Sequence, residues 1–262
     1  MMAATIDCES VKPITAVCFN MHGFNQGYLT IDELIRSKNP DIFLCQEHWL
    51  TPANLHKFED HFPNYFSFGC SAMADRVEME ILSGRPFGGV MILVKKDLRA
   101  ISETVHCEER FAVVRIANYL FVNVYMPCVG IRDRLLLYEG LFEDFWFWRE
   151  RYPSCECLIA GDFNTNLDSS NEVAVFINSF LRSRSLFRCD VLYPQPGQPT
   201  YINLALNQQS RIDFMLCSSS DGVSDFEILD PNINFSDHLP LVVTVSCAIA
   251  SVFVEKKTRG NK

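Results

Sequence analysis

The sequence predicts an α/β fold built on mixed β-sheets, and three observations support this prediction. Residues 14–46 have the pattern of a strand, a helix and a second strand, which is typical of a βαβ unit. Residues 111–116 and 119–124 are apolar runs separated by Ala117 and Asn118, which indicates an antiparallel hairpin. Several apolar segments end at a polar residue that can take part in chemistry, as strands do when they converge on one site.

The length and composition fit one large domain. With 262 residues, of which 48% are hydrophobic, the chain can bury a substantial core. No linker-like stretch divides it, so we expect a single domain over residues 1–262, with a core at about 14–248 and a short N-terminal extension. The basic tail over residues 255–262 is expected to be disordered, and one interpretation makes it a linker to a further domain.

Cysteine usage and the N-terminus indicate an intracellular protein. The eleven cysteines are scattered, and Cys18, Cys45 and Cys217 lie inside apolar runs, where a thiol behaves as a small hydrophobe. This usage favours a reducing compartment over a disulfide framework. Residues 1–9 contain acids and no apolar core, unlike a signal peptide, and no apolar run is as long as a membrane span. We therefore expect a nuclear or cytoplasmic protein without membrane contact.

The first βαβ unit is justified residue by residue. A strand of β-branched and apolar residues covers 14–20 and leads into a glycine-bearing loop at 21–27. The Thr-Ile-Asp-Glu sequence at 30–33 predicts a capping box at the start of a helix, which must end at Asn39-Pro40. A second strand follows at once over residues 41–46.

The middle of the chain contains further strands and a long helix. Residues 52–85 look irregular, and a strand is expected over 87–94 after Gly88-Gly89. Antiparallel strands that lead into a strand with site residues imply a mixed sheet. A helix over 133–151 is ended by Pro153, and we expect its aromatic residues in the core. Its predicted apolar face consists of Leu136, Leu137, Leu141, Phe142, Phe145 and Trp148.

The last third of the chain completes the predicted fold. A capping box at 169–172 opens a helix that runs to about Arg184. Residues 189–209 are rich in Pro, Gln and Asn and are expected to form loops. Segments 211–217 and 241–246 are predicted to close the second sheet.

The stretch Leu158 to Asn166 is the best candidate for the centre of a site. An apolar run stops at a glycine and is followed by Asp162 and Asn164, which alternation places on one side of the backbone while Phe163 packs on the other. A carboxylate beside an amide can hold water or a metal ion and can contact a phosphate. A plain Asp-Asn turn is the alternative. The other converging segments end at Asn20, Gln46-Glu47, Tyr125, Asp213 and Asp237-His238.

These segments resemble the ordered blocks of a known superfamily. They are Asn20, Gln46-Glu47, Asn123 to Pro127, Gly161 to Asn164, Ile212-Asp213 and Ser236 to His238, and together they span about residues 14–246. In this order they resemble the endonuclease/exonuclease/phosphatase superfamily, which includes exonuclease III, abasic-site endonucleases and DNase I. The resemblance implies a four-layered α/β sandwich, DNase I-like, with two packed mixed β-sheets flanked by helices.

A finer resemblance points to the endonuclease domain of non-LTR (LINE-type) retrotransposons. The segments that carry it are Gln46 to Leu50, Gly84 to Val90, Thr200-Tyr201 and Arg211 to Asp213. It implies an enzyme that nicks one strand of double-stranded DNA and leaves a 3′-hydroxyl, which primes a reverse transcriptase domain of the same polyprotein. An abasic-site repair endonuclease is the nearest alternative. A phosphatase of the same superfamily and a non-catalytic binding module are further alternatives.

The resemblance also implies a role for each candidate residue. Glu47 is expected to bind Mg²⁺ or Mn²⁺, with Asn20 and Asp237 in or beside the ligand set. Asp162 is the expected base, and His238, held by Asp213, is expected to contact the phosphate. The residues expected to bind substrate are Tyr125, Asn164, Thr200, Arg211 and His238. His22 departs from the pattern, because many members have Asp or Asn there and a neutral imidazole lacks their charge.

The net charge of −9 is unusual for a protein that binds DNA, because neutralising phosphates requires Lys and Arg. We therefore expect local basic patches, although solvated surface charge is the alternative interpretation of each. The candidate patches are Arg182, Arg184 and Arg188; Lys95, Lys96 and Arg99; and Arg132 and Arg134.

Overall fold

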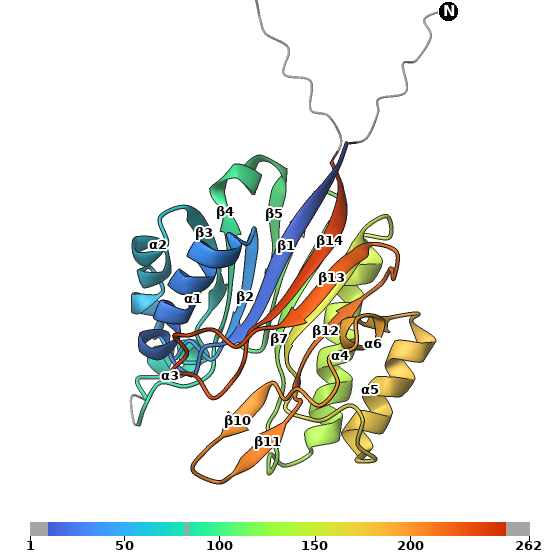
Figure 1. Cartoon of the computed structure of the whole chain (residues 1–262). Helices are drawn as coiled ribbons and strands as arrows, with labels where there is room; N and C mark the ends of the chain where they lie inside the picture. The colour runs from blue at the N-terminus through green and yellow to red at the C-terminus, as the bar shows by residue number, and fades with distance from the viewer. Residues whose placement is uncertain (1–9, 82–83, 250–262) are drawn as a thin grey trace, which may run out of the picture.

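The computed structural model describes residues 10–81 and 84–249, and in these residues two six-stranded β-sheets pack against each other (Figure 1). In spatial order the first sheet contains β13 (Val223–Ile228), β14 (Leu241–Ile249), β1 (Ser10–Asn20), β2 (Ile42–Gln46), β4 (Val90–Lys95) and β3 (Tyr65–Cys70). The second contains β5 (Ser102–Cys107), β6 (Phe111–Ile116), β7 (Tyr119–Tyr125), β8 (Glu156–Asp162), β12 (Asp213–Cys217) and β9 (Phe187–Arg188). A hairpin of β10 (Tyr201–Asn203) and β11 (Gln208–Ser210) lies apart from both.

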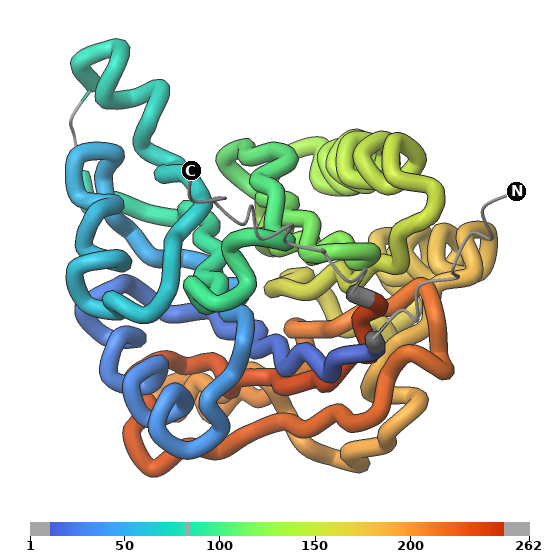
Figure 2. The backbone as a smooth tube through the Cα atoms, turned by 90° about the horizontal axis from the view of Figure 1, so that it is seen from above, coloured from blue at the N-terminus to red at the C-terminus, as the bar shows by residue number. Residues whose placement is uncertain are grey.

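Helices cover the outer face of each sheet: α1 (Phe24–Lys38) and α2 (Lys57–His61) pack on the first, and α4 (Arg134–Arg151) and α5 (Glu172–Ser183) on the second. The other helices are α3 (Ala74–Glu78), which buries none of its residues, and α6 (Cys189–Leu192), whose Cys189 packs in the core between the sheets. The 3₁₀ turns are η1 (Pro52–Asn54) and η2 (Lys96–Ile101). Seen from above, α1 and α4 lie on opposite sides of the two sheets (Figure 2). None of the helices in the described residues is both long and apolar enough to cross a bilayer.

The alternation of side chains along β1 shows how the layers form. Ile14, Ala16 and Cys18 face the apolar core between the sheets, whereas Val17 and Phe19 pack with α1 and α2 on the other side. A matching cluster joins the outer face of the second sheet to α4 and α5. The order helix, sheet, sheet, helix confirms the predicted four-layered α/β sandwich with two mixed sheets.

Each sheet contains one parallel pair among its described strands, and the two pairs end at the same rim. β1 pairs with β2, and β7 pairs with β8, each through a crossover that contains a helix. β2 contacts β7, and β1 contacts β8, across the interior. The carboxyl ends of all four strands therefore lie together, and in Figure 1 the ends of β1 and β2 lie above the β10–β11 hairpin. The predicted convergence of Asn20, Glu47, Tyr125 and Asp162 follows from this pairing.

The structure corrects two predicted helix starts. α1 begins at Phe24, within the predicted loop, and Thr30 is fully buried inside the helix, so the capping box at 30–33 is wrong. The end of α1 at Lys38 is as predicted. α5 is capped by Asn171, whose side chain accepts from the backbone N–H of Ala174, and not by a residue at 169. The start of α1 has no side-chain cap and depends on tertiary packing, whereas the start of α5 is set by a competing local cap two residues after the predicted one.

Other corrections concern the strands and the apolar face of α4. β14 pairs with β1 in the first sheet, so the prediction that 241–246 closes the second sheet is wrong, whereas β12 lies in the second sheet as expected, between β8 and β9. The segment 52–85 includes strand β3 and is not irregular throughout. On α4, Leu136 and Leu137 are exposed, while Phe142 and Phe145 are buried as predicted. The predicted N-terminal extension and basic tail lie outside the described residues.

Candidate active site

Glu47 follows β2 and presents its carboxylate at the shared rim. Its backbone lies in the left-handed region, with φ 54°, and this turns the chain out of the strand. The side-chain nitrogen of Asn20 donates to Glu47 Oε1 at 2.8 Å, and Trp49 Nε1 donates to Oε2 at 3.0 Å. Both carboxylate oxygens are thereby oriented, and each keeps a lone pair that a cation can use.

Asp162 is the last residue of β8 and is 1% exposed. Asn20 Nδ2 donates to its Oδ2 at 3.0 Å, and the backbone N–H of Asn164 donates to its Oδ1 at 2.8 Å. The side-chain amide of Asn20 therefore donates to both Glu47, which follows β2, and Asp162, which ends β8. Burial, together with the charge of Asp213, raises the pKa of Asp162 to about 7. This value suits a group that takes a proton near neutral pH.

His238 forms a buried dyad with Asp213. Its Nδ1 lies 2.9 Å from Asp213 Oδ2, and its Nε2 is 3.9 Å from Asp162 Oδ2 on the side of the rim. Burial alone would lower the pKa of His238, but the charge and hydrogen bond of Asp213, with the charge of Asp162, raise it to about 10. His238 is therefore an imidazolium that offers a charged N–H donor to the rim.

His22 and Asp237 form a second, more open dyad. His22 Nδ1 lies 2.7 Å from Asp237 Oδ1, and the two side chains are 38% and 23% exposed. The hydrogen bond that His22 Nδ1 donates to the Asp237 carboxylate raises the pKa of His22. Burial alone would raise the pKa of Asp237, but the same hydrogen bond, together with the charge of His238, holds that pKa below its usual value. At position 22, where the sequence resemblance led us to expect Asp or Asn, the protonated imidazole thus places a positive charge. One oxygen of Asp237 is used by this contact.

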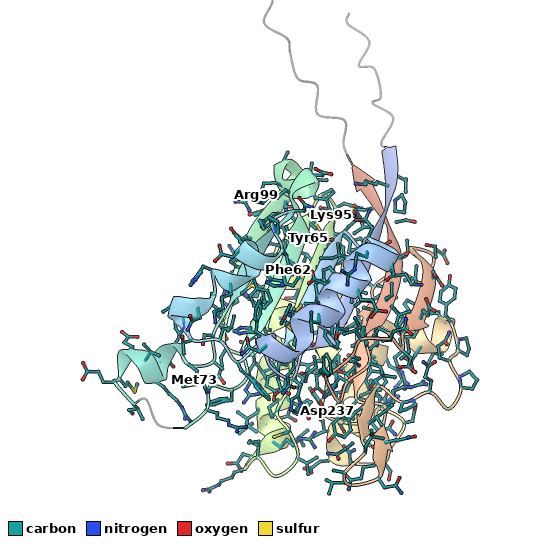
Figure 3. All side chains as sticks on the ribbon, turned by 60° about the vertical axis from the view of Figure 1, so that its left-hand side comes forward. Phe62, Tyr65, Met73, Lys95, Arg99 and Asp237 are labelled. Atoms are coloured by element: carbon teal, nitrogen blue, oxygen red, sulfur yellow. The ribbon has the colours of Figure 1, made fainter. Side chains whose placement is uncertain are left out.

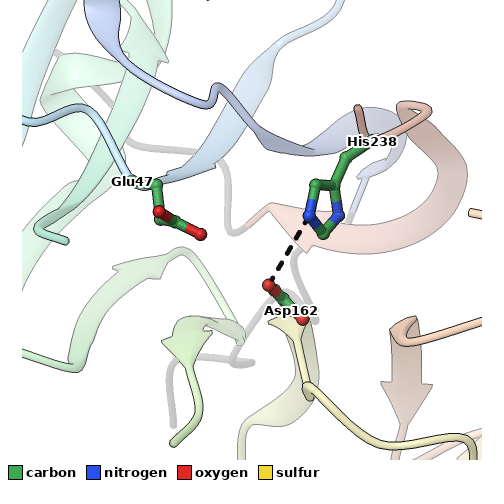
Figure 4. Close-up of side chains that lie close together, drawn as sticks. All are labelled: Glu47, Asp162 and His238. Carbon is green, nitrogen blue, oxygen red and sulfur yellow. Dashed lines mark ion pairs between the residues drawn. The ribbon is translucent and has the colours of Figure 1, made fainter. Parts of the chain in front are cut away.

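The donor set at the rim fits a hard divalent cation. Glu47, Asp162 and His238 each bring one possible ligand atom, and these atoms lie within 4.8 Å of one another (Figure 4). His238 Nδ1 is engaged by Asp213, and a hard cation prefers oxygen ligands to the remaining imidazole nitrogen. Two neighbouring carboxylates remain, and carboxylate oxygens are the ligands that Mg²⁺ and Mn²⁺ prefer. Their mutual repulsion in a buried setting favours a cation between or beside them.

The other predicted site residues have different surroundings. Burial and the charge of Glu47 raise the pKa of Tyr125, so that its hydroxyl keeps its proton and can donate. The side-chain nitrogen of Asn164 donates to Met126 O at 2.9 Å and to Asp162 Oδ2 at 3.3 Å. Asn164 thus holds Asp162 in place, and its amide hydrogens are used within the protein.

Thr200 and Arg211 contact the backbone around the site and not its open part. Thr200 is fully buried, and its hydroxyl accepts the backbone N–H groups of Ile212 and Asp213, each at 3.0 Å. The guanidinium of Arg211 donates to the carbonyl oxygens of residues 195 and 198 and contacts Asp190. Thr200 therefore positions the strand that carries Asp213. The structure does not bring these two side chains into the open part of the rim.

Two contacts of the site were not predicted. Trp49 belongs to the segment Gln46 to Leu50 that carries the finer resemblance, but the sequence did not indicate that its indole N–H donates to Glu47. It indicated that His22 departs from the usual pattern, but not that it pairs with Asp237. Both contacts depend on turns with positive φ, at His22 (48°), Glu47 (54°) and Trp49 (55°), which aim the side chains back over the rim. A side-chain pattern carries no signal for such backbone angles.

The sequence model of the Endonuclease/Exonuclease/phosphatase family matches residues 17–238, which span the whole site. The chain belongs to this family. Members of the family are hydrolytic nucleases and phosphatases that depend on divalent metals, in agreement with the carboxylate pair at the rim. No curated protein matches the chain.

Solved structures of low sequence identity share the family's fold. A 3′ phosphatase, NExo, from Neisseria, bound to a product DNA hairpin, is 14% identical with a TM-score of 0.68, over 88% of this chain and 99% of that one. The AP endonuclease LMAP from Leishmania major is 16% identical with a TM-score of 0.68, over 89% and 87%. A family protein from Bacteroides thetaiotaomicron is 16% identical with a TM-score of 0.65, over 92% and 100%. These likenesses show the fold.

Proposed function

We propose that the chain is a metal-dependent DNA endonuclease that nicks one strand and leaves a 3′-hydroxyl. The observation that carries the proposal is the meeting of Glu47, Asp162 and the protonated His238 within 4.8 Å at one rim. Phosphodiester hydrolysis needs a base for water, positive charge at the phosphoryl oxygens and assistance for the leaving oxygen. The three groups supply a cation ligand, a base and a cationic donor.

Each residue has a defined task in this proposal. Glu47 holds Mg²⁺ or Mn²⁺, which when bound supplies positive charge to the phosphate and the leaving oxygen. Asp162 accepts a proton from the attacking water. His238 donates a hydrogen bond from Nε2 to a non-bridging phosphate oxygen, and Asp213 keeps that imidazole charged and correctly oriented. Tyr125 offers its hydroxyl to another phosphate oxygen.

The finer proposal is a role in target-primed reverse transcription, in which the nick primes a reverse transcriptase domain of the same polyprotein. Its support is the LINE-type sequence segments Gln46 to Leu50 and Gly84 to Val90. In this proposal the choice of target depends partly on local DNA shape and flexibility. The partner is double-stranded DNA, and the cation is Mg²⁺ or Mn²⁺.

A plasmid assay tests the endonuclease. Supercoiled plasmid is incubated with the protein and Mg²⁺, and nicked circles are expected, whereas EDTA should prevent them. Mapping the cut ends should show 3′-hydroxyls that a polymerase extends without further treatment. If Mg²⁺ produces no nicks while the protein remains folded, the non-catalytic binding module becomes the better description.

An abasic-site endonuclease is the second candidate, favoured by the likeness of the fold to the AP endonuclease from Leishmania major. The two candidates differ in substrate preference. Labelled duplexes with and without one abasic site, cleaved side by side, should be cut at similar rates by the nicking enzyme. A strong preference for the abasic duplex would support the repair activity. Release of inorganic phosphate from phosphorylated lipids would instead support a phosphatase.

A further inference from the structure

A pocket lies beside the proposed active site. It has a volume of about 400 Å³ and is formed by the start of α1, the turn after β2, the start of α2 and the segment at Arg85 and Pro86. Pockets that take small ligands have volumes of roughly 300–1,000 Å³. The size therefore fits a ligand about as large as one nucleotide.

The pocket and the active site share a wall. His22 and Trp49 line the pocket, and their ring centroids lie 4.8 Å apart. The same two side chains reach the catalytic rim, where Trp49 Nε1 donates to Glu47 and His22 Nδ1 pairs with Asp237. A ligand group in the pocket would therefore be a neighbour of a substrate phosphate bound at the rim.

The shared wall is held by an unusual backbone arrangement. Gly23 N donates to Glu47 O at 2.7 Å, which joins the loop before α1 to the turn after β2. Gly23 has φ +97°, and a Cβ built there would lie 2.7 Å from Trp49 Cε3, so only glycine permits this approach. With positive φ also at His22, Glu47 and Trp49, strained residues are concentrated around the pocket, as occurs at functional sites.

The lining is suited to a planar, negatively charged ligand. Lys57 and Arg85 line the pocket and have no ion-pair partner in the part of the chain that the structure describes. None of the described lining residues has a carboxylate, although the chain has a net charge of −9. Trp49 supplies a π face, and Asn25 and Asn54 supply amides. Cations bind phosphate, and a ring face binds a base.

We propose that this pocket binds one nucleotide of the DNA strand, next to the phosphate that is cleaved. The base stacks on Trp49, and the adjoining phosphate contacts Lys57 and Arg85. This inference rests on the proposed function, because it names a part of the substrate for the same site. Of the three basic clusters predicted from the sequence, the one that contains Lys95 and Arg99 lies at the end of the molecule opposite Asp237 (Figure 3).

Binding without catalysis tests the proposal. The 5′-phosphorylated dinucleotide pTpT is titrated into the full chain in EDTA, and quenching of tryptophan fluorescence is followed. The chain has three Trp residues, so Trp49→Phe identifies the share of quenching that comes from the pocket. We expect saturable quenching that Trp49→Phe largely removes. We expect the double variant Lys57→Gln with Arg85→Gln to bind at least about tenfold more weakly, because both charged contacts to phosphate are lost.

A matched control removes the same charges elsewhere. The double variant Lys96→Gln with Arg99→Gln also removes one Lys and one Arg, both exposed, and should bind within about twofold of the wild type. Equal binding by the Lys57 and Arg85 variant and by this control would overturn the proposal, as would full quenching in Trp49→Phe. If Trp49→Phe does not fold, the comparison of the two charge variants still decides.

The outcome is distinguishable from failure of the endonuclease proposal. The titration contains no metal and involves no cleavage, so a chain that binds pTpT in the pocket but nicks no plasmid supports the pocket alone. Inositol 1,4-bisphosphate, the soluble headgroup of a phosphorylated lipid, is titrated in parallel. If it binds in the same pocket more tightly than pTpT, the pocket belongs to a lipid headgroup and the nucleotide assignment is wrong.

Discussion

Gln46 Nε2 donates to Asn123 Oδ1 at 2.5 Å, and this bond joins the two sheets through the apolar core. Asn123 Nδ2 in turn donates to the carbonyl oxygens of Cys45 at 2.8 Å and Met91 at 3.0 Å. Both amides are fully buried. Because β2 and β7 belong to different sheets, the network fixes how the two parallel pairs sit against each other, and so aligns Glu47 with Asp162.

We predict that Gln46→Leu destabilises the fold by about 1–3 kcal/mol, because it leaves Asn123 Oδ1 buried without a donor. Urea unfolding followed by circular dichroism measures the change. Gln209→Leu is the control, since Gln209 is exposed on β11 and the same substitution there should alter the free energy of unfolding by less than about 0.5 kcal/mol. Equal effects of the two substitutions would show that the network does not hold the sheets.

Asp162→Asn is predicted to lower the nicking rate by about 10²–10⁴-fold, because an amide cannot accept the proton of water. The fold should survive, since the amide has nearly the same shape as the carboxylate. Plasmid nicking gives the rate and circular dichroism checks the fold. Asp144→Asn removes an exposed carboxylate on α4 and should leave the rate unchanged. Turnover at the wild-type level in Asp162→Asn would assign the base to another group.

Asp213 and His238 are predicted to act as one unit. Asp213→Asn removes the partner that keeps the imidazole charged, so it should lower the rate by about the same factor as His238→Gln. The double variant should lose little more than either single variant, because effects within one unit are not additive. Nicking rates of the four proteins at one pH complete the cycle. If the rate loss of the double variant equals the product of the two single rate losses, Asp213 and His238 contribute independently.

Glu47→Gln is predicted to weaken metal binding. In the wild type, Mn²⁺ binds the folded chain and should raise the melting temperature, whereas EDTA should return it to the metal-free value. Glu47→Gln loses the charge that holds the cation and should show a smaller rise at the same Mn²⁺ concentration. Glu143→Gln, on the exposed side of α4, should respond as the wild type does. An undiminished rise in Glu47→Gln would move the metal to other ligands.

The resemblance to the superfamily implied the four layers, whereas the sequence pattern itself predicted the rim. Apolar segments that end in polar residues, such as 14–20 and 158–162, indicated strands that converge on one site, and parallel pairing brings their carboxyl ends together. The sheet to which β14 belongs could not be predicted this way. Its partner β1 lies at the other end of the chain, and an apolar strand fits equally well beside several neighbours.

Some contacts of the site could not be predicted from the sequence for a different reason. Gln46 and Asn123 follow the same pattern as the catalytic candidates, a polar residue at or near the end of an apolar strand, yet both are buried in a structural network. The pairing of His22 with Asp237 joins residues 215 positions apart. In both cases the role depends on which long-range neighbour is present, and periodicity along the chain contains no such information.

Gly23→Ala is predicted to disturb the site through Trp49. A Cβ at Gly23 would lie 2.7 Å from Trp49 Cε3, and φ +97° is strained for alanine, so the ring must move away and release its hydrogen bond to Glu47 Oε2. We expect a loss of about 1–3 kcal/mol in the free energy of unfolding and a weaker stabilisation by Mn²⁺.

Gly140→Ala is the control, because nothing lies within 4 Å of a Cβ there and alanine favours the α4 helix. It should stabilise the chain by about 0.5–1 kcal/mol and leave the response to Mn²⁺ intact. Identical behaviour of the two variants would mean that the position of Trp49 does not depend on Gly23.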